Sequence, residues 1–222
     1  STWDNILPDF YRYADSFHNA ALTGNSNIQT YLYEGWNCLD TGTPMGCPND
    51  YSDSLLWVPR VRTDLPTFEG VMDSLNALHP TANPVYIIPA AQALANLSDS
   101  INANAVPGLS NFRNDLFTDD IHPNDLGFYF VALVHFATIY KRTPVGLPAQ
   151  TFGEWGGPFN PPSAAMALKM QEIAWQTVCS YTRSGVACFP LSIKNIVGAT
   201  SGPKVKTEDV SIYPNPSNGG IK

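Results

Sequence analysis

The residues of this chain best suited to acid–base chemistry lie in the stretch 117–127. Asp119 comes three residues before His122, and Pro123, Asn124 and an apolar run follow directly. A carboxylate at this spacing can hold an imidazole in one tautomer. The imidazole can then take a proton from a hydroxyl nucleophile and return it to the leaving group. The spacing therefore predicts a proton-transfer pair in which His122 is the base and Asp119 orients it.

Two other interpretations fit the same stretch, because Asp-x-x-His spacings also arise by chance. In the first, Asp119 or Asp120 caps the helix that follows and His122 has no chemical role. In the second, the chain is a metal-dependent hydrolase that binds its ion through Asp119, Asp120 and His122. We expect neither a metal site nor a cofactor, because no cysteine or histidine spacing in the chain is typical of a metal site.

The elements that must position this pair are readable from hydrophobic spacing. Two short runs rich in branched and aromatic residues, 28–33 and 84–89, are typical of strands. Helices are expected at 3–22, 54–78 (broken near Pro59 and Pro66), 90–105, 124–142 and 161–181. Strands that alternate with helices predict an α/β fold with a parallel sheet covered on both faces. Two strands are few for such a sheet, so further strands are expected before Ser1.

Composition narrows the class of partner. Of the 222 residues, 44% are hydrophobic and 14% are charged, which favours a packed globule over a disordered chain. The net charge is -7, and lysine and arginine form no stripe, so no nucleic acid partner is expected. No uninterrupted apolar run reaches the ~20 residues that a membrane helix needs, so no membrane span is expected either.

Four cysteines form two close pairs along the chain. Cys38 and Cys47 flank one turn-rich loop, and Cys179 and Cys188 flank another. Neither spacing is that of a metal site, so we predict two local disulfides, with four free thiols as the alternative. Disulfides would place the protein in an oxidising compartment.

The stretch 119–127 as a whole resembles the Asp-x-x-His-Pro-Asn-x-x-Gly block that precedes a helix in SGNH/GDSL hydrolases. Phrases at the two strand ends, 31–36 and 87–90, look like the same class, and the similarity covers roughly residues 1–150. The resemblance implies a three-layer α/β/α, flavodoxin-like SGNH fold with a parallel sheet, its N-terminal strands missing here. It also implies an esterase with an acyl-enzyme mechanism, in which Asp119 and His122 match the family's triad residues.

The chain departs from the family pattern at the nucleophile. No Gly-Asp-Ser or Gly-His-Ser tripeptide occurs, and Ser16, the nearest match, falls inside a predicted helix. We therefore expect the nucleophile and the oxyanion donors upstream of this sequence. Glu34, Trp36 and Asn37 follow the first strand, where ligands of open α/β sheets bind, and are candidate substrate-binding residues. Alternatively, Trp36 is a core aromatic beneath the Cys38 loop.

The C-terminal part divides into three further segments. Residues 151–198 are expected to form a helical extension packed on the hydrolase, and 199–209 a polar linker. Residues 210–222 resemble the opening of the type IX secretion sorting domain of Bacteroidetes, the alternative being a plain proline-rich tail. The resemblance implies a secreted or cell-surface protein and the type IX secretion machinery as a partner.

Together these features favour a secreted esterase whose substrate is a small-molecule or carbohydrate ester. The alternative function is a catalytically inactive SGNH-like module that binds glycans or a cell-surface partner.

Overall fold

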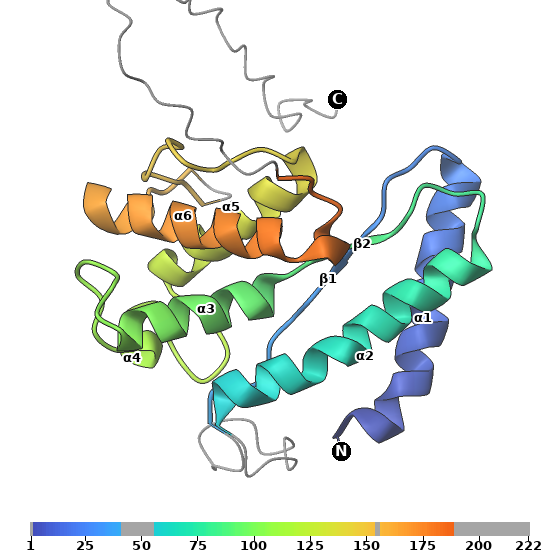
Figure 1. The fold of residues 1–222 in the computed structure, drawn as a ribbon, viewed down its shortest axis with the longest axis horizontal. Coiled ribbons are helices and arrows are strands. Elements are labelled where there is room, and N and C mark those ends of the chain that lie inside the picture. The colour runs from blue at the N-terminus through green and yellow to red at the C-terminus, as the bar shows by residue number, and fades with distance from the viewer. Residues whose placement is uncertain (1, 41–55, 154–155, 189–222) are drawn as a thin grey trace, which may run out of the picture. The chain divides into compact units, whose positions relative to one another are not determined.

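The chain folds as a mixed α/β unit made mostly of helices. The structure is a computed structural model that describes residues 2–40, 56–153 and 156–188, with side chains from residue 6 onward, and one compact unit spans Ser1–Cys188 (Figure 1). The predicted α/β class and parallel sheet are confirmed. The elements are α1 (Thr2–Gly24), β1 (Tyr31–Tyr33), α2 (Trp57–Leu78), β2 (Tyr86–Ile88), α3 (Ala90–Asn102), α4 (Phe112–Leu116), α5 (Asp125–Tyr140), α6 (Ala164–Ser180) and the short 3-10 helix η1 (Thr182–Ser184).

Within the described residues the sheet has two parallel strands. Tyr31 pairs with Tyr86, Leu32 with Ile87 and Tyr33 with Ile88. Two further backbone bonds lengthen the pairing, from Tyr86 to the Thr30 carbonyl (3.3 Å) and from Glu34 to the Ile88 carbonyl (3.1 Å). The connection through α2 makes β1–α2–β2 one βαβ unit.

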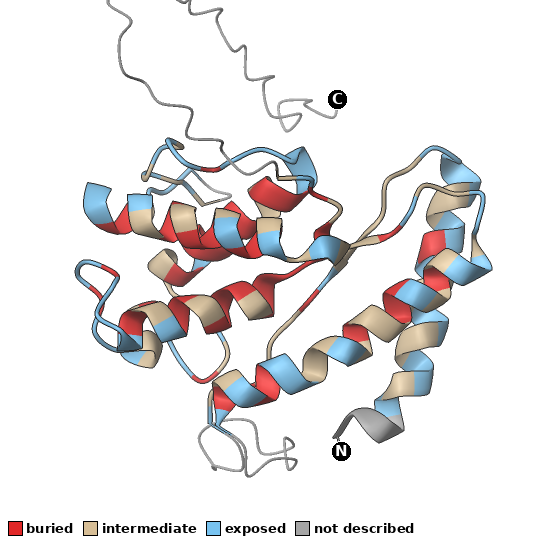
Figure 2. Cartoon of the chain, in the orientation of Figure 1, coloured by how far each residue is buried: buried red, intermediate tan, exposed pale blue. Residues whose placement is uncertain are grey.

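The strands separate two apolar clusters, as the alternation of side chains along a strand requires. Leu32 and Ile87 face α1 and α2, where Phe68, Val71 and Leu75 are buried. Tyr31 and Ile88 belong to the other cluster, which is built mainly from α3, α5 and α6. Figure 2 shows buried residues concentrated on α3 and on parts of α2 and α6, whereas α1 is mostly intermediate or exposed.

The predicted break in the second helix is wrong. Helix α2 runs without interruption from Trp57 to Leu78, with Pro66 inside it. Pro59 falls in the first turn, where its missing N–H has no helical partner to lose. Pro66 does cost one helical hydrogen bond. Phe68 and Leu75 are buried beyond it, and this packing keeps the helix continuous.

The predicted Cys179–Cys188 disulfide is confirmed, with the two Cα atoms 5.3 Å apart. It joins the last turn of α6 to the segment that follows η1. The other predicted bridge depends on Cys47, which lies outside the described residues. Helix α6 buries Met170 and Ala174 in the same cluster as α3 and α5, so residues 156–188 share a core with the preceding part of the chain. The linker 199–209 and the tail 210–222 lie outside the described residues.

Candidate functional site

A closed turn carries His122, and its backbone is fixed at both ends. We call residues 117–123 the His122 turn. Phe117 and Pro123 form an isolated antiparallel bridge across its base. Inside it, the carbonyl oxygen of His122 accepts hydrogen bonds from the Thr118 N–H (2.8 Å) and the Thr118 hydroxyl (3.0 Å). The backbone of His122 is therefore held independently of its side chain.

The residues that follow His122 explain how the turn joins α5. The Asn124 side chain caps the helix by accepting from the N–H groups of Leu126 (3.0 Å) and Gly127 (3.2 Å). Its amide donates to the Asp115 carbonyl at 2.9 Å. A Cβ on Gly127 would collide with the Leu116 carbonyl oxygen and lie 2.7 Å from the Pro123 Cβ. The Pro-Asn-x-x-Gly spacing thus has a structural cause in this chain.

Asp119 and His122 meet as the sequence predicts. His122 Nδ1 lies 2.7 Å from Asp119 Oδ2, and Asp119 Oδ1 accepts from the N–H groups of His122 (2.7 Å) and Ile121 (2.8 Å). These donors, with the His122 N–H first and then that of Ile121 and the imidazole, lower the pKa of Asp119 to about 2. Asn124 caps α5, so neither aspartate does, which removes the capping alternative.

The other ring nitrogen of His122 is accessible. The side chain of His122 is 71% exposed and that of Asp119 54%. Among the described residues none bonds to His122 Nε2. An open depression of about 560 Å3, also lined by Asn124, Phe128 and Asn160, adjoins the ring. With Nδ1–H donated to Asp119, Nε2 carries the free lone pair that a general base needs.

Asp120 turns away from this pair. It is buried and forms an ion pair with Arg113, and its carbonyl accepts from the Leu39 N–H at 2.8 Å. Asp119, Asp120 and His122 therefore do not share a ligand position. Over the described part of the chain, no three His, Cys, Asp or Glu side chains gather as a metal site would require.

Trp36 connects the sheet to the His122 turn. Its indole Nε1–H donates to the Ile121 carbonyl at 3.0 Å, and its ring meets the Phe117 ring edge-on at 6.4 Å between centroids. Trp36 is half-buried and follows β1, so the His122 turn lies at the carboxyl end of β1. Ligands of open α/β sheets bind at this edge.

Asn37 and Glu34 face other neighbours. The Asn37 amide donates to Asp64 of α2. Glu34 is buried, and its carboxylate accepts from the N–H (3.2 Å) and the side-chain amide (2.8 Å) of Gln92 in the first turn of α3. Burial raises the pKa of Glu34 to about 7 despite these donors. The structure therefore brings Trp36, but neither Glu34 nor the Asn37 amide, against the His122 turn.

Replacing Glu34 with glutamine should remove a pH dependence of stability. The unfolded carboxyl has a pKa of 4.5 and the folded one about 7, so between these values the folded state holds the extra proton. The free energy of unfolding should therefore fall as pH rises through this window, by on the order of 2–3 kcal/mol. Urea unfolding at pH 5 and pH 8 measures the fall, which Glu34→Gln should abolish. Glu172→Gln, at a partly exposed salt bridge with Lys169, should leave the fall intact. An unchanged fall in Glu34→Gln would contradict the assignment.

Sequence patterns did not predict a second group of interacting residues, which is formed by Asp15, His18 and His79. His79 Nε2 lies 2.7 Å from Asp15, and the His18 ring packs edge-on against the His79 ring at 4.8 Å. These residues lie on α1 and just after α2, apart from the His122 turn. Ser16 is helical, and its hydroxyl donates to the Arg12 carbonyl. Among the described residues no serine, threonine or cysteine side chain bonds to the His122 ring.

Comparison with known proteins gives no relative: no family model, no curated protein and no solved structure matches this chain. In the described residues, none of the helices combines the length and apolarity needed to cross a membrane. The assignment of function therefore depends on the geometry of the His122 turn.

Proposed function

We propose that this chain supplies the acid–base pair of a serine esterase of the SGNH/GDSL type, with the three-layer arrangement of that class. In this scheme a serine from the polypeptide upstream of the sequence attacks the ester carbonyl. His122 Nε2 takes the serine proton and returns it to the departing alkoxide. Water then hydrolyses the acyl-enzyme by the same route, with His122 again accepting and returning the proton.

The observation that carries the proposal is the orientation of the imidazole. Asp119 is itself immobilised by two backbone N–H groups, and its second oxygen holds His122 Nδ1 at 2.7 Å. This leaves His122 Nε2 facing solvent with its lone pair free. Because the pKa of Asp119 is about 2, the carboxylate stays charged throughout the pH range of ester hydrolysis and stabilises the imidazolium that forms.

The proposal also includes secretion of the protein and a class of ester substrate. The Cys179–Cys188 bridge is of the kind that persists in oxidising compartments, which supports a secreted or cell-surface protein. Delivery by type IX secretion rests on the resemblance of residues 210–222 to a sorting domain. The open surface around His122 suits an acyl group on a carbohydrate or another small alcohol, since both sides of the ester can extend into solvent.

A fluorophosphonate probe tests the acyl-enzyme mechanism. In the full-length polypeptide, including the coding sequence upstream of Ser1, we expect covalent labelling of one serine, located by peptide mass mapping outside residues 1–222. Labelling should vanish on heat denaturation because it requires the assembled site. The 222-residue chain should not be labelled at Ser16, whose hydroxyl is held by its own helix. Absence of any labelled serine in the full-length protein would refute the proposal.

The alternative is a binding module without catalysis, and one observation favours it. No hydroxyl or thiol among the described residues bonds to the His122 ring, so the Asp119–His122 pair has no nucleophile among those residues. A full-length protein that bound acylated glycans without hydrolysing them, and was not labelled by the probe, would support this alternative.

A further inference from the structure

A pocket with both polar and apolar walls lies between α2, α3 and α4. It is formed where the first two turns of α2 meet the end of α3 and the start of α4, and its volume is about 560 Å3. Sites for small molecules typically have about 300–1,000 Å3. We call it the α2–α4 pocket; its lining includes Trp57, Arg62, Ser98, Asp99, Asn102 and Phe112.

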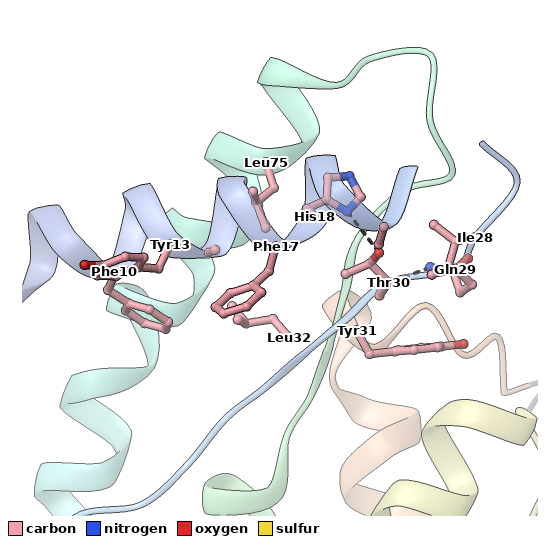
Figure 3. A pocket seen from close by; sticks show the side chains of 12 residues that line it. Phe10, Tyr13, Phe17, His18, Ile28, Gln29, Thr30, Tyr31, Leu32 and Leu75 are labelled. Carbon is pink, nitrogen blue, oxygen red and sulfur yellow. Dashed lines mark hydrogen bonds between the residues drawn. The ribbon is translucent and has the colours of Figure 1, made fainter. Parts of the chain in front are cut away.

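The pocket between α1 and β1 differs in the chemistry of its walls. Its volume is about 490 Å3, and Phe10, Phe17 and Leu32 are among the side chains that line it (Figure 3). His18 is buried in its wall and bonds through Nδ1 to the Thr30 hydroxyl at 2.9 Å. Walls made mainly of hydrocarbon fix neither the orientation nor the class of a ligand, whereas a few well-placed polar groups fix both. The α2–α4 pocket has such groups.

One of these groups is a buried hydroxyl. Ser98 of α3 is only 6% exposed and lines the pocket. Within the described part of the chain its hydroxyl has no hydrogen-bond partner, whereas that of Ser100 on the same helix donates to the Asn96 carbonyl at 2.8 Å. Buried polar groups are almost always paired, because leaving one unpaired is costly. Ser98 is therefore placed to bond to a molecule inside the pocket.

The charged groups in the lining are balanced. Arg62 forms an ion pair with Asp99. Arg113 forms ion pairs with Asp40 and with the buried Asp120. Each arginine thus has a carboxylate beside it, so the lining strongly attracts neither anions nor cations. A charged ligand would have to displace one of these partners, whereas a neutral ligand would not.

Aromatic rings supply the apolar part of the lining. The Trp57 and Phe112 rings lie with their centroids 5.0 Å apart and their planes tilted by 36°. The Ser98 hydroxyl, the Asn102 amide and the paired ions belong to the same lining and include both donors and acceptors. A hydroxyl group also donates and accepts, so this lining suits a ligand that carries several hydroxyls on an apolar ring. A neutral sugar has this chemistry.

We propose that the α2–α4 pocket is a binding site for a neutral saccharide. The Ser98 hydroxyl bonds to a sugar hydroxyl, and the Trp57 and Phe112 rings pack against the apolar face of the sugar. This site is separate from the depression beside His122, because the two linings have no residue in common.

The α2–α4 pocket adjoins the His122 turn. Leu39 and Arg113 both line the pocket. The Leu39 N–H donates to the Asp120 carbonyl of the turn at 2.8 Å, and Arg113 pairs with the Asp120 side chain. A saccharide bound here lies next to the segment that carries His122 and can anchor a glycan whose ester reaches that residue. Only this anchoring rests on the proposed function; the binding of the saccharide does not.

Equilibrium binding of sugars that carry no O-acyl ester tests the site without catalysis. The 222-residue chain is titrated with glucose, galactose, xylose and N-acetylglucosamine, and separately with sodium sulfate as an anion. We expect saturable binding of at least one sugar, with shifts of the backbone amide resonances of Trp57, Ser98 and Phe112, and no binding of sulfate at these amides. Absence of saturable sugar binding overturns the proposal. Sulfate binding at these amides without sugar binding would show an anion site and overturn it as well.

Ser98→Ala separates recognition from structure. Because the Ser98 hydroxyl has no partner in the described residues, its removal should leave the urea midpoint unchanged or slightly higher, while sugar binding weakens at least about tenfold. Ser100→Ala is the matched control on the same helix, since its hydroxyl bonds to the helix backbone, and it should bind sugar as the parent does. Undiminished sugar binding by Ser98→Ala would refute the site.

Failure of the site and failure of the proposed function are distinguishable. A full-length protein that binds sugar in this pocket but hydrolyses no ester would retain the saccharide site and refute the esterase assignment. A full-length protein that hydrolyses esters through His122 but binds no sugar would retain the esterase assignment and refute the saccharide site.

Discussion

Replacing His122 with alanine in the full-length polypeptide should abolish ester hydrolysis and leave the fold intact. The imidazole is 71% exposed, and the backbone carbonyl of His122, rather than its ring, closes the His122 turn. The mutation therefore removes the proposed proton transfer but little packing. Loss of a triad member costs on the order of 10^3–10^6 in kcat. Turnover of a p-nitrophenyl ester and the urea midpoint of the same samples measure the two effects.

Three comparison variants separate chemistry from structure. Asp119→Asn keeps a carbonyl oxygen for the N–H groups of Ile121 and His122 but weakens the hold on the imidazole, so kcat should fall by about 10^3–10^4. His79→Ala, at a histidine paired with Asp15, should hydrolyse esters normally. Asp120→Asn should lower stability more than kcat, because Asp120 is buried against Arg113. Full activity in His122→Ala would refute the esterase assignment.

The spacing of apolar residues was sufficient to predict the helices whose formation depends mainly on nearby residues. The apolar spacing of α1 and α5 predicted both helices to within two residues at each end. The Asp119–His122 contact was also predictable, since a three-residue separation inside one turn leaves few geometries. Local pattern failed where tertiary packing decides, as at Pro66, where buried neighbours keep α2 helical. The five-residue α4 was missed because it is too short to show a period.

The contacts that surround the candidate site could not be predicted from sequence, because they join residues far apart along the chain. Trp36 and Ile121 are 85 residues apart, and Glu34 and Gln92 are 58 apart. The Glu34–Gln92 contact exists because β1 and β2 are parallel and end at the same edge of the sheet, whereas Ile121 follows α4 rather than a strand. The sequence placed Glu34, Trp36 and Asn37 at that edge, but it could not show which neighbour each side chain selects.

Replacing Gly127 with alanine should destabilise the protein, although alanine is the better helix former. In an unhindered helix interior this change stabilises by about 1 kcal/mol. Here the new Cβ would collide with the Leu116 carbonyl and crowd Pro123, two groups that bracket the His122 turn. Both belong to backbone or ring that cannot swing aside, so we expect a net loss of about 2–3 kcal/mol in the free energy of unfolding.

Gly70→Ala is the matched control, because Gly70 also lies inside a helix and its added Cβ would meet only the hydroxyl end of Tyr11. That side chain can rotate away, so Gly70→Ala should be neutral or slightly stabilising in the same urea unfolding experiment. The two variants together separate steric conflict from helix propensity. In full-length Gly127→Ala, relief of the collision must move Leu116 or Pro123, which displaces His122 relative to the proposed nucleophile. Turnover should therefore fall more steeply than stability alone explains, with at least a tenfold lower kcat for the folded fraction. A Gly127→Ala protein as stable and active as the parent would show that the glycine does not hold the His122 turn in place.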